Sequence, residues 1–302
     1  MRINSSSFST TMLNSINRNT VQMNKLMSQI SAQKRILTPS DDPIASTQIV
    51  QMRREQAVTG QYQTNIERLT HSLRQQETLV DSTSTQLLGM LDKLREANNS
   101  SNSKADMAGY AAELVSMKEA LVERLNGKDE SGRYLFAGTK TNEKPFVRDA
   151  ATGEWVYAGN QNSNYTPVGN GSEMRSNTDL ATAFGGNLET LNDLEDLLTK
   201  MSDPALSHDD YADDLTAMLK QMQSTSDNVA AVLTDIGGRQ NNLTSLQDAH
   251  TDLQILNEEM LDGLQGLDFA KAFTDLSRYS TATQATYQTY QQIANLSLFS
   301  LR

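Results

Sequence analysis

Residues 215–267 read LTAMLKQMQSTSDNVAAVLTDIGGRQNNLTSLQDAHTDLQILNEEMLDGLQGL, and apolar residues recur there at spacings of three, four or their sum. The apolar positions are Leu215, Met218, Met222, Val229, Val232, Ile236, Leu243, Leu246, Leu253, Met260, Leu264 and Leu267. This spacing follows the a and d positions of a heptad, which line one seam of a helix that needs helical partners. The polar residues Thr225, Arg239, His250 and Asn257 interrupt the seam. The stretch predicts a coiled-coil helix of about eight heptads.

Residues 43–97 carry a second seam that can serve as its partner. Asp42 followed by Pro43 is a favourable N-cap and first helical residue, so we expect a helix to begin there. Its apolar residues repeat at close to seven positions: Ile66, Leu69, Leu73, Val80, Leu87, Met90 and Leu94. The pattern predicts one helix from Pro43 to about Ala97.

The middle of the sequence changes character. Shorter helices are expected at 105–125, closed by a left-handed cap at Asn126-Gly127, and at 188–201. Between them the helical periodicity disappears, and alternating runs at 133–136 and 154–157 predict short strands. Residues 141–187 are therefore expected to form a small β-rich insertion.

Both ends of the chain are poor in acidic residues. Residues 1–40 contain no Asp or Glu, and residues 279–301 contain no charged residue. Apolar residues recur at helical spacing in both segments, and a single helix cannot cover such a stripe. We therefore expect an assembly interface. Its candidate residues are Ile16, Met23, Ile30, Phe269, Phe273, Leu276, Tyr287, Tyr290, Leu298 and Phe299.

Composition argues against several functional classes. The 302 residues carry a net charge of −11 and no cysteine, which excludes disulfides, thiolate metal sites and cysteine nucleophiles. Such acidity disfavours nucleic acid and anionic membranes as partners. No window approaches 18 apolar residues, and residues 1–10 lack the apolar run of a Sec signal peptide. We expect neither a nucleic-acid nor a membrane partner.

Few residues suggest chemistry. The cluster His208-Asp209-Asp210 with Asp213-Asp214 could hold a divalent cation, but acidic residues at this point also favour the start of a helix. His71 and His250 each lie on a predicted helix with no second histidine and no cysteine beside them, so neither is expected to be a catalytic base. We expect no catalytic residue, no metal and no cofactor, and hence no enzyme.

The pair Gly237-Gly238 lies inside the long seam. It is either a kink or a point where a neighbouring helix packs too closely for a Cβ. The second interpretation is favoured here.

Several segments resemble one family. The run Ser31–Pro43, SAQKRILTPSDDP, resembles the N-terminal signature of flagellar axial proteins, and its Ser-Asp-Asp-Pro ending resembles the hook-associated protein 3 family. Flagellin typically has Asp-Asp followed by Ala-Ala-Gly there. Residues 131–138 with Pro145-Phe146, residues 236–243 and residues 295–299 are similar to other segments of this hook–filament junction family. Residues 145–190 match no segment of it.

The resemblance implies a mainly α fold: an elongated, flagellin-like rod of long antiparallel coiled-coil helices from both chain ends, with a small β-rich domain inserted in the middle. It implies three regions. The regions are 1–42 with 266–302 as an inner assembly coiled coil, 43–140 with 188–265 as a helical rod, and 141–187 as an outer β-rich insertion.

The implied function is a structural subunit of the bacterial flagellum that forms the junction ring between hook and filament. The implied partners are further copies of the chain, hook-associated protein 1, flagellin, and a cytosolic export chaperone on the C-terminal segment. Export through the flagellar type III apparatus would place it outside the cell. The alternatives are flagellin itself and a type III secreted coiled-coil effector.

Overall fold

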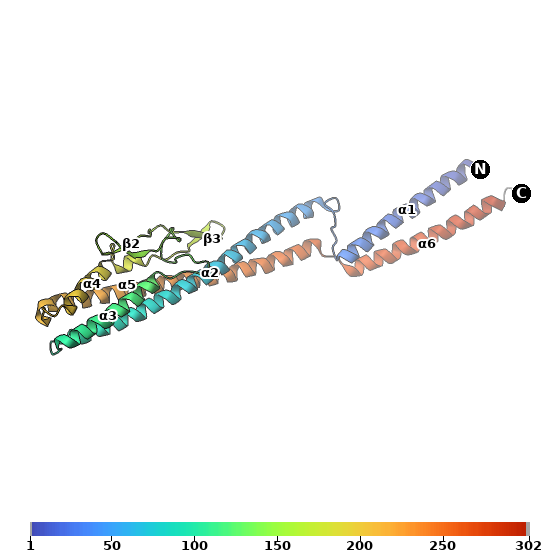
Figure 1. Ribbon diagram of the computed structural model, residues 1–302. Coiled ribbons are helices and arrows are strands. Elements are labelled where there is room, and N and C mark those ends of the chain that lie inside the picture. Colours follow the sequence, from blue (N-terminus) through green and yellow to red (C-terminus); the bar gives the residue numbers. More distant parts are fainter. Residues whose placement is uncertain (1, 300–302) are drawn as a thin grey trace. The chain divides into compact units, whose positions relative to one another are not determined.

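The computed structural model describes the backbone of residues 2–299 and the side chains of residues 7–292 (Figure 1). Six helices dominate it, with two strand pairs and one short 3-10 helix between them. The elements are α1 (Arg2–Ala32), α2 (Pro43–Ala97), α3 (Lys104–Leu125), β1 (Phe146–Arg148), β2 (Trp155–Tyr157), β3 (Tyr165–Gly169), β4 (Ser172–Arg175), η1 (Ala181–Phe184), α4 (Glu189–Ser202), α5 (His208–Gln265) and α6 (Phe269–Phe299). The predicted fold class, mainly helical with a β-rich middle, is confirmed.

The chain divides into two compact units. The terminal unit comprises residues 1–58 and 252–302, and the central unit comprises residues 59–251. Both boundaries fall inside helices, one in α2 and one in α5.

In the central unit, α2, α3, α4 and α5 share one apolar core. Leucines are completely buried on each of these helices: Leu73, Leu87 and Leu94 on α2, Leu114 and Leu121 on α3, Leu194 on α4, and Leu215 and Leu243 on α5. The predicted seams of α2 and α5 therefore face this core. Burial of each such leucine contributes about 1.5–3 kcal/mol, which explains why the helices form here.

Helix ends follow the expected capping chemistry in most places. Asp42 accepts a hydrogen bond from the Ala45 N–H (3.1 Å), and α2 begins at Pro43 and ends at Ala97, as predicted. Ser103 and Asp106 form a reciprocal capping box at the start of α3.

The predicted left-handed cap at Asn126-Gly127 is wrong. Asn126 has φ −94°, and Gly127 does not have positive φ either. The side chain of Asn126 instead donates to the carbonyls of Val122 (2.9 Å) and Phe146 (3.0 Å) and accepts from the Phe146 N–H (3.0 Å). It thus joins the end of α3 to β1, a long-range partner that the local sequence does not reveal.

The insertion contains two small antiparallel sheets, β1–β2 and β3–β4. Trp155–Tyr157 forms β2, as expected, and pairs in register with β1. The strand predicted at 133–136 is wrong, because this segment makes only an isolated bridge between Lys128 and Tyr134. Asp129 holds the segment in a turn by accepting hydrogen bonds from the N–H groups of Ser131 and Arg133.

The close-packing interpretation of Gly237-Gly238 is also wrong. A Cβ at either position would meet no atom within 4 Å, and α5 continues through both residues. Neither glycine is therefore required by a neighbouring helix.

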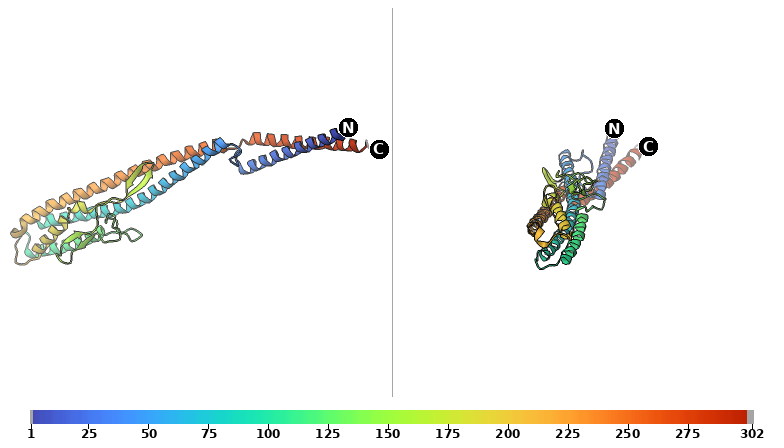
Figure 2. Two further views of the ribbon diagram at one scale, coloured as in Figure 1. Left: turned by 90° about the horizontal axis from the view of Figure 1, so that it is seen from above. Right: turned by 60° about the vertical axis from the view of Figure 1, so that its left-hand side comes forward.

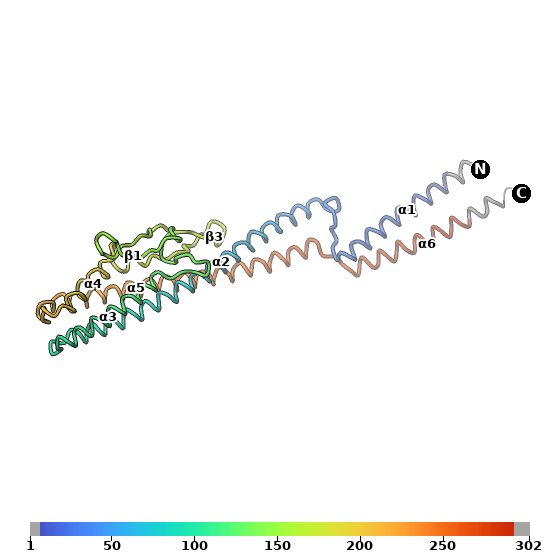
Figure 3. Tube along the Cα trace, viewed as in Figure 1, coloured from blue at the N-terminus to red at the C-terminus, as the bar shows by residue number. Residues whose placement is uncertain are grey.

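In the terminal unit, α1 and α6 lie side by side along their lengths, as two further views and the Cα trace show (Figure 2, Figure 3). The terminal unit also contains the beginning of α2 and the end of α5. They meet in a small apolar cluster of Ile49, Met52 and Leu261, with Ile36 and Leu264 against it. This cluster is much smaller than the core of the central unit.

Candidate functional site

Exposed apolar side chains are concentrated in the terminal unit. Among the residues whose side chains the structure describes, all but two of the exposed large apolar residues belong to it, and the exceptions are Leu88 and Tyr165. The members on the paired terminal helices include Phe8, Leu13, Val21, Met27, Phe269, Phe273 and Tyr287. Exposed apolar residues gathered in one part of a protein are typical of an interface with another protein.

The heptad seam of α5 contributes to this surface. From Leu215 to Leu243 its residues are buried, except Val232, which is half-buried against the core, but Leu253 is 48% exposed and Met260 is 50% exposed. Leu261 is buried in place of Met260. A straight helix drifts by about 20° per heptad relative to a seven-residue repeat, so the predicted seam turns away from its partner over this length. The predicted helix is thus present over its length as α5, but its seam is covered mainly in the central unit, and in the terminal unit Leu264 packs against the apolar cluster while Leu253 and Met260 are exposed.

The candidate interface residues fall into three groups. Ile16, Met23 and Ile30 on α1 are half-buried, and so are Leu276 and Tyr290 on α6. Phe269, Phe273 and Tyr287 are exposed, at 41%, 55% and 55%. Leu298 and Phe299 have side chains outside the described residues.

The two stripes therefore divide between internal packing and free surface. Thr283 on α6 places its hydroxyl 4.0 Å from the Met23 sulfur, which locates Met23 between the two terminal helices. The exposed aromatic residues of α6, in contrast, keep a large part of their surface free among the described residues. They remain the candidates for contact with another molecule.

The segment 33–42, here called the signature loop, connects α1 to α2 and has a dense hydrogen-bond network. The Asp41 carboxylate accepts from the N–H groups of Leu37 and Thr38, both at 3.0 Å, and pairs with Lys25 Nζ at 2.7 Å. The hydrogen bond from Lys25 and those two N–H groups hold the pKa of Asp41 far below its usual range. Asp41 is therefore ionised at neutral pH and closes the loop against α1.

The same loop is tied to the end of α5. Arg35 donates its backbone N–H to the Gln265 carbonyl (2.7 Å) and its guanidinium to the Leu264 carbonyl (2.9 Å). Its guanidinium also pairs with Asp42 at 3.3 Å. Hydrogen bonding from the Ala45 N–H lowers the pKa of Asp42, with a contribution from Arg35. The loop thus fixes the entry to α2 against the C-terminal end of α5.

Three of the polar residues that interrupt the α5 seam bind other parts of the central unit. The hydroxyls of Thr225 and Thr190 lie 2.9 Å apart, which links α5 to α4. Arg239 donates to the carbonyls of Arg175 (3.0 Å) and Asn177 (3.2 Å). Nε2 of His250 lies 2.7 Å from the Val168 carbonyl and is therefore its donor. Periodicity alone marked these positions as interruptions of the seam, whereas Arg239 and His250 bind the insertion and Thr225 binds α4.

Helix α2 makes matching contacts with the β3–β4 hairpin. Asn65 donates to the Pro167 carbonyl (2.9 Å), and Gln76, which is 1% exposed, donates to the Ser176 carbonyl (3.0 Å). The hairpin is therefore held from two helices, mainly by side-chain donors on its backbone carbonyls. Sequence reasoning missed these residues because their partners are about 100 positions away.

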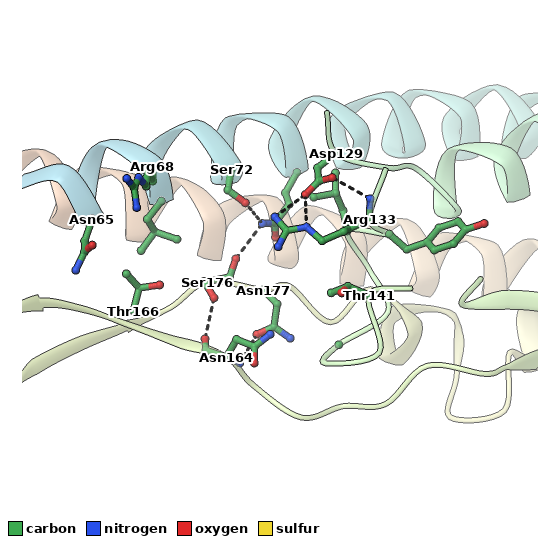
Figure 4. Close-up of a pocket in the computed structure, with 15 residues that line it drawn as sticks. Asn65, Arg68, Ser72, Asp129, Arg133, Thr141, Asn164, Thr166, Ser176 and Asn177 are labelled. Carbon is green, nitrogen blue, oxygen red and sulfur yellow. Dashed lines mark hydrogen bonds and ion pairs between the residues drawn. The ribbon is translucent and has the colours of Figure 1, made fainter. Parts of the chain in front are cut away.

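A polar cavity of about 360 Å³ lies beside these contacts (Figure 4). Its walls come from α2, from the turn at 129–141 and from the hairpin. Asp129 pairs with Arg133 at 2.8 Å, and Ser72 accepts from Gln76 at 3.2 Å. The lining offers amides and hydroxyls that are largely engaged with one another, which fits a role in docking the hairpin.

The acidic cluster at the start of α5 is engaged in local structure. Asp210 accepts from the backbone N–H and the hydroxyl of Ser207, both at 2.7 Å, and these bonds lower its pKa. Asp214 pairs with Lys200 at 2.5 Å, and Asp209 is fully exposed. Among the described residues, no three His, Cys, Asp or Glu side chains are placed to hold a metal ion. Over the same part of the chain, no helix has the length and apolar character needed to cross a bilayer.

Comparisons with known proteins agree with the helical organisation. Residues 3–141 match the bacterial flagellin N-terminal helical region. Flagellar hook-associated protein 3 of Salmonella typhimurium is 26% identical, over 100% of this chain and 99% of its own. Flagellar hook-associated protein 3 of Escherichia coli is 25% identical, over 90% of both chains.

Solved structures give the same result. Hook-associated protein-3 of Legionella pneumophila is 16% identical, with a TM-score of 0.65 over 72% of this chain and 98% of its own, and it shares the fold. A Vibrio parahaemolyticus protein described as a flagellar hook-associated protein is 31% identical, with a TM-score of 0.68. The match covers 75% of this chain and 100% of that one. The chain therefore belongs to the flagellar hook-associated protein 3 family.

Proposed function

We propose that this protein is a non-enzymatic structural subunit that forms the junction between hook and filament of the bacterial flagellum, and that it assembles through its terminal unit. The observation that supports this most strongly is the concentration of exposed apolar side chains in that unit. A chain that stayed monomeric would leave this surface in water at a high cost in free energy. Family membership supplies the flagellar setting.

The three regions expected from the sequence are part of this proposal. Residues 1–42 and 266–302 form the inner assembly coiled coil, residues 43–140 and 188–265 form the rod, and residues 141–187 form an outer insertion. The signature loop lies where the first two regions meet, and there Asp41 pairs with Lys25 of α1 and Arg35 donates to the Leu264 carbonyl near the end of α5. One face of the ring would contact hook-associated protein 1, and the other would contact flagellin.

Before assembly, the terminal helices need protection. We propose that a cytosolic export chaperone covers the C-terminal segment, which has no charged residue from 279 to 301. Export through the flagellar type III apparatus then places the subunit outside the cell. Its partners are other flagellar proteins, and the net charge of −11 disfavours nucleic acid and anionic membranes.

The experiment that tests the function is deletion of the gene in its own bacterium, with electron microscopy of the cells and assay of flagellin in the medium. We expect hooks without filaments and flagellin released as monomers, both reversed by the wild-type gene. Hooks without filaments and without released flagellin would favour the alternative, flagellin itself. Intact flagella would contradict both assignments.

A further inference from the structure

The terminal unit contains an apolar groove between α2 and α5. Its volume is about 500 Å³. Its apolar lining consists of Met52, which is buried, Leu264, and Met260, which is 50% exposed. A Cβ placed on Gly263 would meet no atom within 4 Å, so that wall is open, and Gln51 and Glu55 form a polar rim. The groove can therefore accept apolar side chains from outside.

The start of α6 carries an exposed pair of aromatic rings. Phe269 and Phe273 are 41% and 55% exposed, and their ring centroids lie 6.4 Å apart with the planes inclined at 28°. One face of α6 thus presents both rings together. Lys271, which lies between them in the sequence, forms no ion pair with any described carboxylate.

From these two features we infer that the Phe269–Phe273 pair of one subunit inserts into the Met52–Met260–Leu264 groove of a neighbouring copy. The inference rests on the proposed function, since it requires that the subunits assemble. A ring or helical array needs a contact between two different patches of the same subunit, whereas a two-fold dimer needs one patch that fits itself. The aromatic pair and the groove are two such patches.

Position and charge support this occupant. Only four residues separate Leu264, which lines the groove, from Phe269. The groove and the aromatic pair are therefore close to each other along the chain. A contact between them would join copies side by side. The unpaired Lys271 would also approach the acidic rim at Glu55, an attraction that favours this register.

The absence of cysteine permits a direct test. Full-length Phe273→Cys and Met260→Cys variants are expressed in one deletion strain, and the isolated flagella are treated with a short bis-maleimide. We expect a cross-linked dimer only when both variants are present, because the two cysteines then come from different copies. The control replaces Met260→Cys with Leu88→Cys, which is equally exposed but lies in the central unit.

Two results would overturn the inference: flagella that contain both variants without a cross-link, or a cross-link that forms as readily with Leu88→Cys. A charge exchange provides a second measurement. Lys271→Glu should weaken incorporation by about 3- to 10-fold, and Glu55→Lys in the same chain should restore it. Failure of restoration would count against this register.

Failure of the groove assignment can be distinguished from failure of the proposed function. If the wild-type gene did not restore filaments to the deletion strain, the function itself would fail. If it restored them and the cysteine pair gave no cross-link, only the groove assignment would fail.

Discussion

At the scale of the residue, the most informative side chains are polar ones with distant partners. Asp41 is surrounded by three donors, and Arg239 is 9% exposed yet binds two backbone carbonyls. The sequence marked Asp42 as a cap because its partner is three residues away. It gave no comparable signal for Arg239, whose partners are more than 60 residues away.

The charge of Asp41 should control the order of the signature loop. Its folded-state pKa is lowered, so its contribution to stability is present above the ordinary carboxyl pKa of about 4 and disappears as pH falls through the lower folded-state value. Asp41→Asn should therefore accelerate amide hydrogen exchange at Leu37 and Thr38 by about 5- to 10-fold at pH 7. The wild-type loop should approach this behaviour only in strong acid.

Asp252→Asn is the matched control, because Asp252 is exposed in the same unit. Equal exchange rates in Asp41→Asn and wild type at pH 7 would show that the carboxylate does not order the loop.

Arg239 should be required for docking of the β3–β4 hairpin. Arg239→Met keeps the apolar stem but leaves the carbonyls of Arg175 and Asn177 without a donor. We expect a loss of about 2–3 kcal/mol in the free energy of unfolding by urea, and faster proteolysis between residues 160 and 180. Arg74→Met, on the exposed face of α2, should change neither quantity. A stable hairpin in the Arg239 variant would mean that the other contacts suffice.

At the scale of the element, helices are predictable and the irregular segments between them are not. The limits of α2 agree with its cap and its repeat, because both signals are local. The turn at 129–134, the cap after α3 and the exposure of Leu253 and Met260 in the seam differ from prediction for physical reasons. Asp129 competes for backbone donors, Asn126 binds β1, and helical drift rotates the seam away from its partner.

Gly238 offers a test of α5 as a helix. It is exposed, and a Cβ there would meet no atom within 4 Å. Gly238→Ala should raise the free energy of unfolding by about 1 kcal/mol, because alanine loses less backbone entropy in a helix. Gly138→Ala is the control and should lower the free energy of unfolding. Gly138 has φ +67°, and a Cβ there would lie 1.9 Å from the Asn160 carbonyl oxygen. Destabilisation by Gly238→Ala would indicate that α5 must bend there.

At the scale of the whole molecule, the two units differ in what they bury. The central unit has a continuous core, and polar side chains fasten its insertion to the helices. The terminal unit has a small cluster and a large exposed apolar surface. The sequence indicated this surface through the apolar stripes at its two ends, one free of acidic residues and the other free of any charge over residues 279–301. It could not show which aromatic residues are free, because that depends on how α1 and α6 pack.

The most direct test of assembly through the terminal unit is the fate of Phe273→Asp in the deletion strain. We expect the variant to be secreted at the wild-type level but to be absent from isolated flagella, because a carboxylate at this position opposes burial in an apolar interface. Tyr165→Asp, at an exposed position of the central unit, should be incorporated normally. Filaments of normal number and length in cells that carry Phe273→Asp would contradict the account.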